Sequence, residues 1–120
     1  MKEIDFESDS FSDIIAKDVR YDARAYALVM DVIHFLGEGG KHMTAGDILD
    51  EFKECALDQY GPMAYAVLRE WGVNSCEDIG EMMFNLTDSG RVKKNDDDTP
   101  EAFAGGYDFK ETFLGPYMVD

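Results

Sequence analysis

The stretch "SCEDIGEMMFNLTDSGRVKK", residues 75–94, reads as a helix that ends at a glycine and continues into a basic segment. Ser75 can cap this helix, and Asp78 stands at the capping-box position. Gly90 suits the left-handed conformation with which many helices end. One side of the helix is apolar and carries Ile79, Met82, Met83 and Leu86. A helix that passes into a basic strand is typical of the DNA-reading helix and wing of winged-helix proteins.

Helical periodicity covers most of the chain before residue 75. Thr44 with Asp47 resembles a capping box, and Pro62 suits the first turn of a helix because its missing N–H is not needed there. The expected helices are a short one capped by Ser10 or Ser12, one over 22–36 ended by Gly37, Gly39 and Gly40, one from Thr44, and one from Pro62 to Gly72.

The residues after Gly90 indicate a change to β structure. The segments "RVKKN" (91–95) and "AFAGGYDF" (102–109) resemble two strands joined by the polar loop "DDDTPE". Gly105 and Gly106 would form a bulge in the second strand. We therefore expect residues 1–120 to form a single, mainly α domain with a C-terminal β-hairpin, either winged-helix-like or a helical bundle with an appended hairpin. Residues 1–9 are expected to be loosely ordered.

The charge of the chain limits its partners. The 120 residues include 26 acidic and 11 basic side chains, a net charge of −15. Such a surface repels nucleic-acid phosphates and anionic lipids. No apolar run is long enough to span a bilayer, and "MKEIDFESDSF" lacks the basic and apolar regions of a signal peptide. We expect a cytoplasmic protein without membrane contacts, in which Cys55 and Cys76 are reduced and buried.

The helix at 76–89 lacks the side chains that would hold it on DNA. A reading helix presents Arg, Lys, Asn or Gln to base edges and cations to phosphate. This segment contains Glu77, Asp78, Glu81 and Asp88 but neither lysine nor arginine. A nucleic-acid regulator would need one basic face made by Arg91, Lys93, Lys94 and Lys110. We rank that hypothesis third, because the net charge opposes it.

The sequence shows no residue set typical of a metal site, a cofactor or a catalytic centre. The acidic loop from Asn95 places Pro100 and Gly106 where an EF-hand needs a glycine and a bidentate acid. His34 and His42 share no short metal motif. Neither a nucleophile elbow nor a dinucleotide fingerprint is present. The sequence therefore favours a non-enzymatic protein.

Two sets of residues are candidates for function. The first is an interaction surface: Trp71, Gly80, Phe84, Tyr107 and Phe109. Aromatic residues anchor many interfaces, and a glycine inside a helix costs about 1 kcal/mol relative to alanine, so something should approach its backbone closely. The same aromatic residues also fit a core. The second set is a polar site for a small ligand or a reaction: His42, Asp78, Asn85 and Asp108. The leading hypothesis is an interaction or adaptor module, with self-association left open.

Four segments of the chain together resemble a known family. They are "ALDQYGPMA" (56–64), "LREWGV" (68–73), "CEDIGEMMFNL" (76–86) and "GGYDF" (105–109). The family is one of uncharacterised proteins found mainly in Planctomycetes and Verrucomicrobia, and the resemblance runs from about Ile14 to Phe113. The sequence departs from the family pattern at Ala45, because the family pattern has a glycine directly after the residue that corresponds to Thr44. The resemblance implies a bacterial cytoplasmic protein and no particular reaction.

Overall fold

The computed structural model describes residues 11–37, 44–92 and 100–117. Helix α2 (Ser12–Lys17) is followed by α3 (Ala23–Gly37), α4 (Ala45–Tyr60), the 3-10 turn η1 (Gly61–Met63) and α5 (Ala64–Glu70). The second half contains α6 (Cys76–Asp88), the 3-10 helix η2 (Pro100–Phe103), α7 (Phe109–Leu114) and η3 (Gly115–Tyr117). The prediction of a mainly helical chain is confirmed for these residues.

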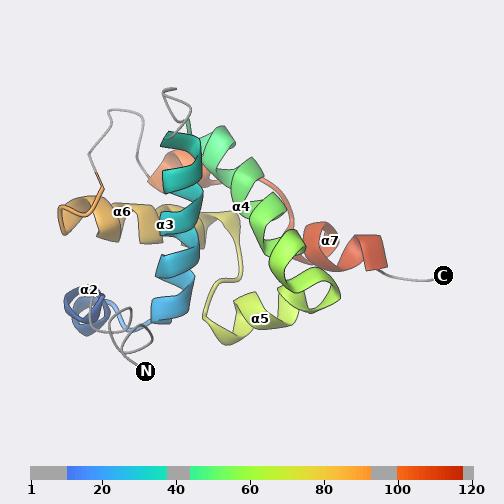
Figure 1. The fold of residues 1–120 in the computed structure, drawn as a ribbon, viewed down its shortest axis with the longest axis horizontal. Coiled ribbons are helices and arrows are strands. Elements are labelled where there is room, and N and C mark those ends of the chain that lie inside the picture. The colour runs from blue at the N-terminus through green and yellow to red at the C-terminus, as the bar shows by residue number, and fades with distance from the viewer. Residues whose placement is uncertain (1–10, 38–43, 93–99, 118–120) are drawn as a thin grey trace.

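Helix α3 stands at the centre of the molecule, with α4 beside it and α6 crossing behind it (Figure 1). Helix α5 lies below α4, and α7 packs against both at the right of the view (Figure 1). The buried side chains of all these helices form one cluster. Its largest fully buried members include Tyr26, Phe52, Leu68, Ile79, Phe103 and Phe113. Burial of each such side chain stabilises the fold by about 1.5–3 kcal/mol.

Side-chain caps fix where α4, α6 and α7 begin. The Thr44 hydroxyl accepts a hydrogen bond from the Asp47 amide at 3.1 Å, and the Asp47 carboxylate accepts one from the Thr44 amide at 3.2 Å. This capping box confirms the predicted start of α4. The predicted cap of α2 by Ser12 is wrong, since Phe11 occupies that position and Ser12 lies in the first turn. Ser10, the alternative cap, lies outside the described residues.

The expected C-terminal β-hairpin is wrong. Residues 11–37, 44–92 and 100–117 contain no strand. The predicted second strand holds the end of η2, a turn at Gly105 (φ +75°) and the start of α7. Its apolar side chains alternate like those of a strand because Phe103 and Phe109 point inward from two separate short helices. Asp108 begins α7, with its carboxylate accepting from the Glu111 amide at 2.8 Å.

A winged-helix arrangement needs that hairpin as its wing, so the winged-helix interpretation is also corrected. The alternative, a helical bundle with an appended hairpin, fails for the same reason. Of the predicted first strand, Arg91 and Val92 form a turn in which both amides donate to the Leu86 carbonyl. The rest of that strand and residues 1–9 lie outside the described residues.

Gly80 of α6 faces Phe103 of η2, so the close approach expected at this glycine occurs within the chain. A Cβ at Gly80 would lie 3.0 Å from the Cβ and Cδ1 of Phe103. Phe103 is fully buried and cannot swing out to solvent. The absence of a side chain at Gly80 therefore lets η2 pack directly against the backbone of α6.

We expect Gly80→Ala to destabilise the protein by about 1 kcal/mol, although alanine is the better helix former. The helix propensity gain of about 1 kcal/mol is outweighed by overpacking, which costs about 1–3 kcal/mol. Gly46→Ala is the matched control, because the nearest atom to its new Cβ is 3.8 Å away. Urea unfolding should show Gly46→Ala as neutral or stabilising. Stabilisation by both substitutions would contradict the tight packing of Phe103.

Candidate functional site

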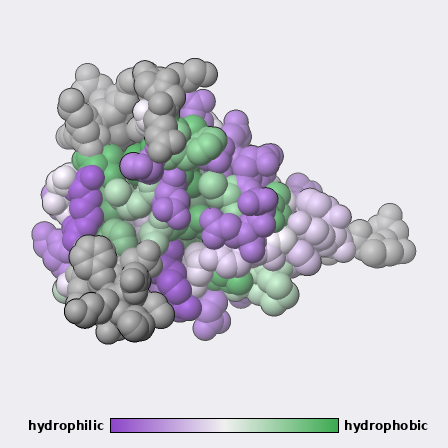
Figure 2. Space-filling model, in the orientation of Figure 1, coloured by the Kyte–Doolittle hydropathy of each residue, from purple (hydrophilic) through white to green (hydrophobic). Residues whose placement is uncertain are grey.

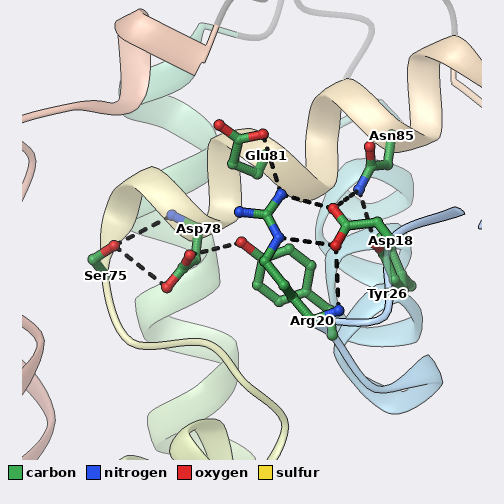
Figure 3. Close-up of polar contacts among 8 residues, drawn as sticks. Asp18, Arg20, Tyr26, Ser75, Asp78, Glu81 and Asn85 are labelled. Carbon is green, nitrogen blue, oxygen red and sulfur yellow. Dashed lines mark hydrogen bonds and ion pairs between the residues drawn. The ribbon is translucent and has the colours of Figure 1, made fainter. Parts of the chain in front are cut away.

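Asp78 and Asn85, two of the residues predicted for a polar site, lie on one face of α6 (Figure 3). They are seven residues apart, which is close to two helical turns. Both are hydrogen-bonded to residues around the turn at 18–22, between α2 and α3. The structure thus brings this pair together with partners that the sequence analysis did not single out.

Asp78 joins the start of α6 to the α2–α3 turn. Its carboxylate accepts hydrogen bonds from the Tyr21 hydroxyl at 2.6 Å and from the Asn74 amide at 2.8 Å. The Asp78 amide donates to the capping Ser75 hydroxyl at 3.3 Å. A negative charge in the first turn of a helix is further stabilised by the helix dipole. The Asp78 carboxylate therefore links the α2–α3 turn, through Tyr21, to the residues just before α6, through Asn74.

Asp18 receives most of the donors in this region. Its carboxylate accepts from Nε and Nη2 of Arg20 at 2.8 and 2.7 Å, and from Nδ2 of Asn85 at 3.0 Å. Arg20 also reaches Glu81 of α6 at 3.5 Å (Figure 3). The guanidinium of Arg20 holds the pKa of the Asp18 carboxyl far below its usual range. The Asp18 carboxyl is therefore ionised in the folded protein at neutral and mildly acidic pH.

Two phenols complete this group, which we call the α6 polar network: Asp18, Arg20, Tyr21, Tyr26, Asp78 and Asn85. The Tyr26 hydroxyl accepts from Nδ2 of Asn85 at 3.0 Å. Burial raises the pKa of both Tyr21 and Tyr26. The shifts of Asp18 and of the tyrosines all move away from neutrality, whereas a general acid or base works best with a pKa near the ambient pH. The network is therefore built to hold α2 and α3 on α6.

An open groove of about 510 Å³ lies beside this network. We call it the α5 groove; its lining residues are Ile15, residues 19–23 of the α2–α3 turn, and residues 69–72 at the end of α5. Its volume lies within the range of ordinary ligand pockets. Val19, on its wall, is 81% exposed, the largest exposure among the large hydrophobic side chains of the described residues.

The floor of the α5 groove is held by backbone contacts. Gly72 has φ +90°, and a Cβ there would collide with the carbonyl oxygen of Arg20. The Asp22 amide donates to the Trp71 carbonyl at 3.1 Å. The indole of Trp71 is buried, with the guanidinium of Arg24 5.6 Å from its ring centre. The groove is therefore a fixed feature of the fold.

The residues predicted for an interaction surface lie mainly in the interior. Trp71, Gly80 and Phe109 are buried. Tyr107 is half-buried, and its hydroxyl donates to the Leu49 carbonyl at 2.8 Å. Phe84 is 49% exposed. Of the five, only Trp71 lines the α5 groove.

The other predicted polar residues do not join Asp78 and Asn85. Asp108 caps α7, whose packing partners are α4, α5 and η3, and His42 lies outside the described residues. No group of histidine, cysteine and acidic side chains with metal-binding geometry occurs within the described part of the chain. Cys76 is buried, and burial with the nearby Glu51 carboxylate raises the pKa of Cys55 to about 11.

The segment "KDVRYD" (17–22), for which no function was predicted, contributes half of the α6 polar network and part of the α5 groove. Val19 offered a signal. It stands between Asp18 and Arg20, and a bulky apolar residue flanked by charges in a turn has no helical face on which to be buried.

Comparisons with known proteins indicate neither a family nor a function for this chain. None of the protein-family models, curated proteins or solved structures compared with the chain matches it. Among the described helices, none combines the length and the apolar character needed to cross a lipid bilayer.

Proposed function

We propose that the protein is an interaction module that holds a peptide segment of a partner protein in the α5 groove. The exposed Val19 beside this groove carries the proposal. Apolar side chains gathered at a concave surface are typical of binding sites, whereas a single exposed one is not. Ile15 and Ala23, both half-buried, extend the apolar wall.

The rigidity of the groove supports binding. A site that is ordered before binding avoids the entropy cost of ordering on association. The contact of Gly72 with Arg20, the Asp22–Trp71 backbone hydrogen bond and the Tyr21–Asp78 hydrogen bond fix both walls. A flexible loop, in contrast, would lose conformational entropy as it folded around its partner.

The placement of positive charges supports a protein partner over nucleic acid. Arg20, Arg24 and Arg91 each form a salt bridge with an aspartate of the chain. Arg91 pairs with Asp13 of α2, whereas Lys110 lies on α7 at the other end of the molecule (Figure 1). On the face shown in Figure 2, hydrophilic residues surround smaller hydrophobic areas. With a net charge of −15, such a surface disfavours a polyphosphate.

A random dodecapeptide phage library is the test of this function. Selected peptides should perturb the amide NMR signals of residues 15–23 and 69–72, and Val19→Asp should abolish their binding. Phe84→Asp is the matched control, since Phe84 is an exposed apolar residue on α6 and does not line the groove. Peptides that bind Val19→Asp as tightly as the unmodified chain, or no selectable binder at all, would refute the proposal.

A further inference from the structure

Two of the four arginines of this acidic chain line the α5 groove, and a third lies against one of its lining residues. Arg20 and Arg69 line it, and Arg24 lies over the Trp71 ring at its floor. Arginine presents five N–H donors in a fixed fork. The groove therefore concentrates hydrogen-bond donors in a molecule whose surface is otherwise dominated by acceptors.

Much of this donor capacity is unused. Arg20 bonds Asp18 through Nε and Nη2, and Arg24 bonds Asp22 through the same two nitrogens at 3.0 Å each. Within the described part of the chain, Nη1 of neither arginine has a hydrogen-bond partner. The guanidinium of Arg69 lies 5.7 Å from the centre of the Tyr65 ring, and it forms no salt bridge with any residue that the structure describes. Each of these side chains is exposed, so the free N–H groups are accessible.

Two of the carboxylates near the groove are already paired with Arg20 and Arg24. Both oxygens of Asp22 already bind Arg24, and those of Asp18 bind Arg20 and Asn85. Glu70 is the remaining carboxylate of the lining. A ligand that brings its own carboxylate would pair with the Arg69 guanidinium. A carboxylate matches a guanidinium in both charge and shape.

The geometry points to an acidic peptide as the occupant of the α5 groove, with a carboxylate bound by Arg69 and an apolar side chain packed on Val19. This inference rests on the proposed function and adds the chemistry of the ligand. A short acidic peptide suits the groove better than a nucleic acid for two reasons. Val19, Ile15 and Ala23 would pack against an apolar side chain of the peptide. The net charge of −15 repels a long polyanion more strongly than a peptide with one or two carboxylates.

The same dodecapeptide library tests the chemistry. Peptides that map to residues 15–23 and 69–72 should be enriched in Asp and Glu next to an apolar residue. Arg69→Glu should weaken them by about twofold to fivefold, the size expected for an exposed Arg–carboxylate pair, and reselection on this variant should favour Lys and Arg. Lys110→Glu, on α7, makes the same charge reversal away from the groove and should leave binding unchanged.

The outcomes separate the two proposals. Groove-binding peptides that are neutral or basic, or that tolerate Arg69→Glu, would overturn the acidic ligand and leave the interaction module standing. Failure of every peptide to map to the groove would overturn both. Tighter binding of a single-stranded oligonucleotide than of any selected peptide would also overturn the acidic-peptide inference.

Discussion

Gly72→Ala should destabilise the protein by about 2–4 kcal/mol. Two effects add. A non-glycine residue at φ +90° is strained, which costs about 1–3 kcal/mol. The new Cβ also collides with the backbone carbonyl of Arg20, so the α2–α3 turn must move and the Asp22–Trp71 hydrogen bond is lost, at a further cost of about 1 kcal/mol or more. Urea unfolding followed by the fluorescence of Trp71, the sole tryptophan, measures the change.

Gly90→Ala separates the two effects. Gly90 follows α6 with φ +86°, yet its new Cβ would meet nothing within 4 Å. It should therefore lose only the conformational part, about 1–3 kcal/mol, and should be less destabilising than Gly72→Ala. Equal losses for Gly72→Ala and Gly90→Ala would show that the α2–α3 turn does not press on Gly72, and the floor of the α5 groove would then not be fixed as described.

The helices were predictable because each is encoded by neighbouring residues. The predicted helix over 22–36 corresponds to α3 at Ala23–Gly37, and the Ser75 cap and the Thr44 capping box occur as expected. A cap and its first turn lie within four residues, so their pattern is visible in the sequence. Asp108 followed by Glu111 carries the same signal for α7, whereas the alternation of apolar residues before it predicts a strand.

The groove could not be predicted in the same way, since its walls come from segments about fifty residues apart. Which side of Gly72 meets Arg20 is decided by how α5 packs against α4 and α7. The polar pair was partly accessible, because Asp78 and Asn85 share a face of α6 at a spacing of seven residues. Their partner Asp18 was not, since nothing local links residue 18 to residue 85.

Asp18→Asn should cost about 2–3 kcal/mol at pH 7, because hydrogen bonds to a charged group contribute more than neutral ones. Asparagine keeps one acceptor but loses the charge that pairs with Arg20, and its amide group would face Nδ2 of Asn85. The Asp18 side chain is only 16% exposed, so water cannot replace these partners fully. Asp13→Asn is the matched control: its carboxylate also pairs with an arginine but is 61% exposed, and the loss should be much smaller.

The cost of Asp18→Asn should also depend on pH. The pKa of Asp18 is lowered in the folded chain relative to the unfolded one. Its stabilising contribution is therefore complete above the unfolded pKa of about 4 and is lost as the pH falls through the folded pKa. Measured at pH 7, 5 and 3, the difference between the unmodified chain and the variant should be constant at the first two and shrink at the third. A difference that persists unchanged at pH 3 would mean that Asp18 contributes by packing, and that its charge does not hold the α2–α3 turn on α6.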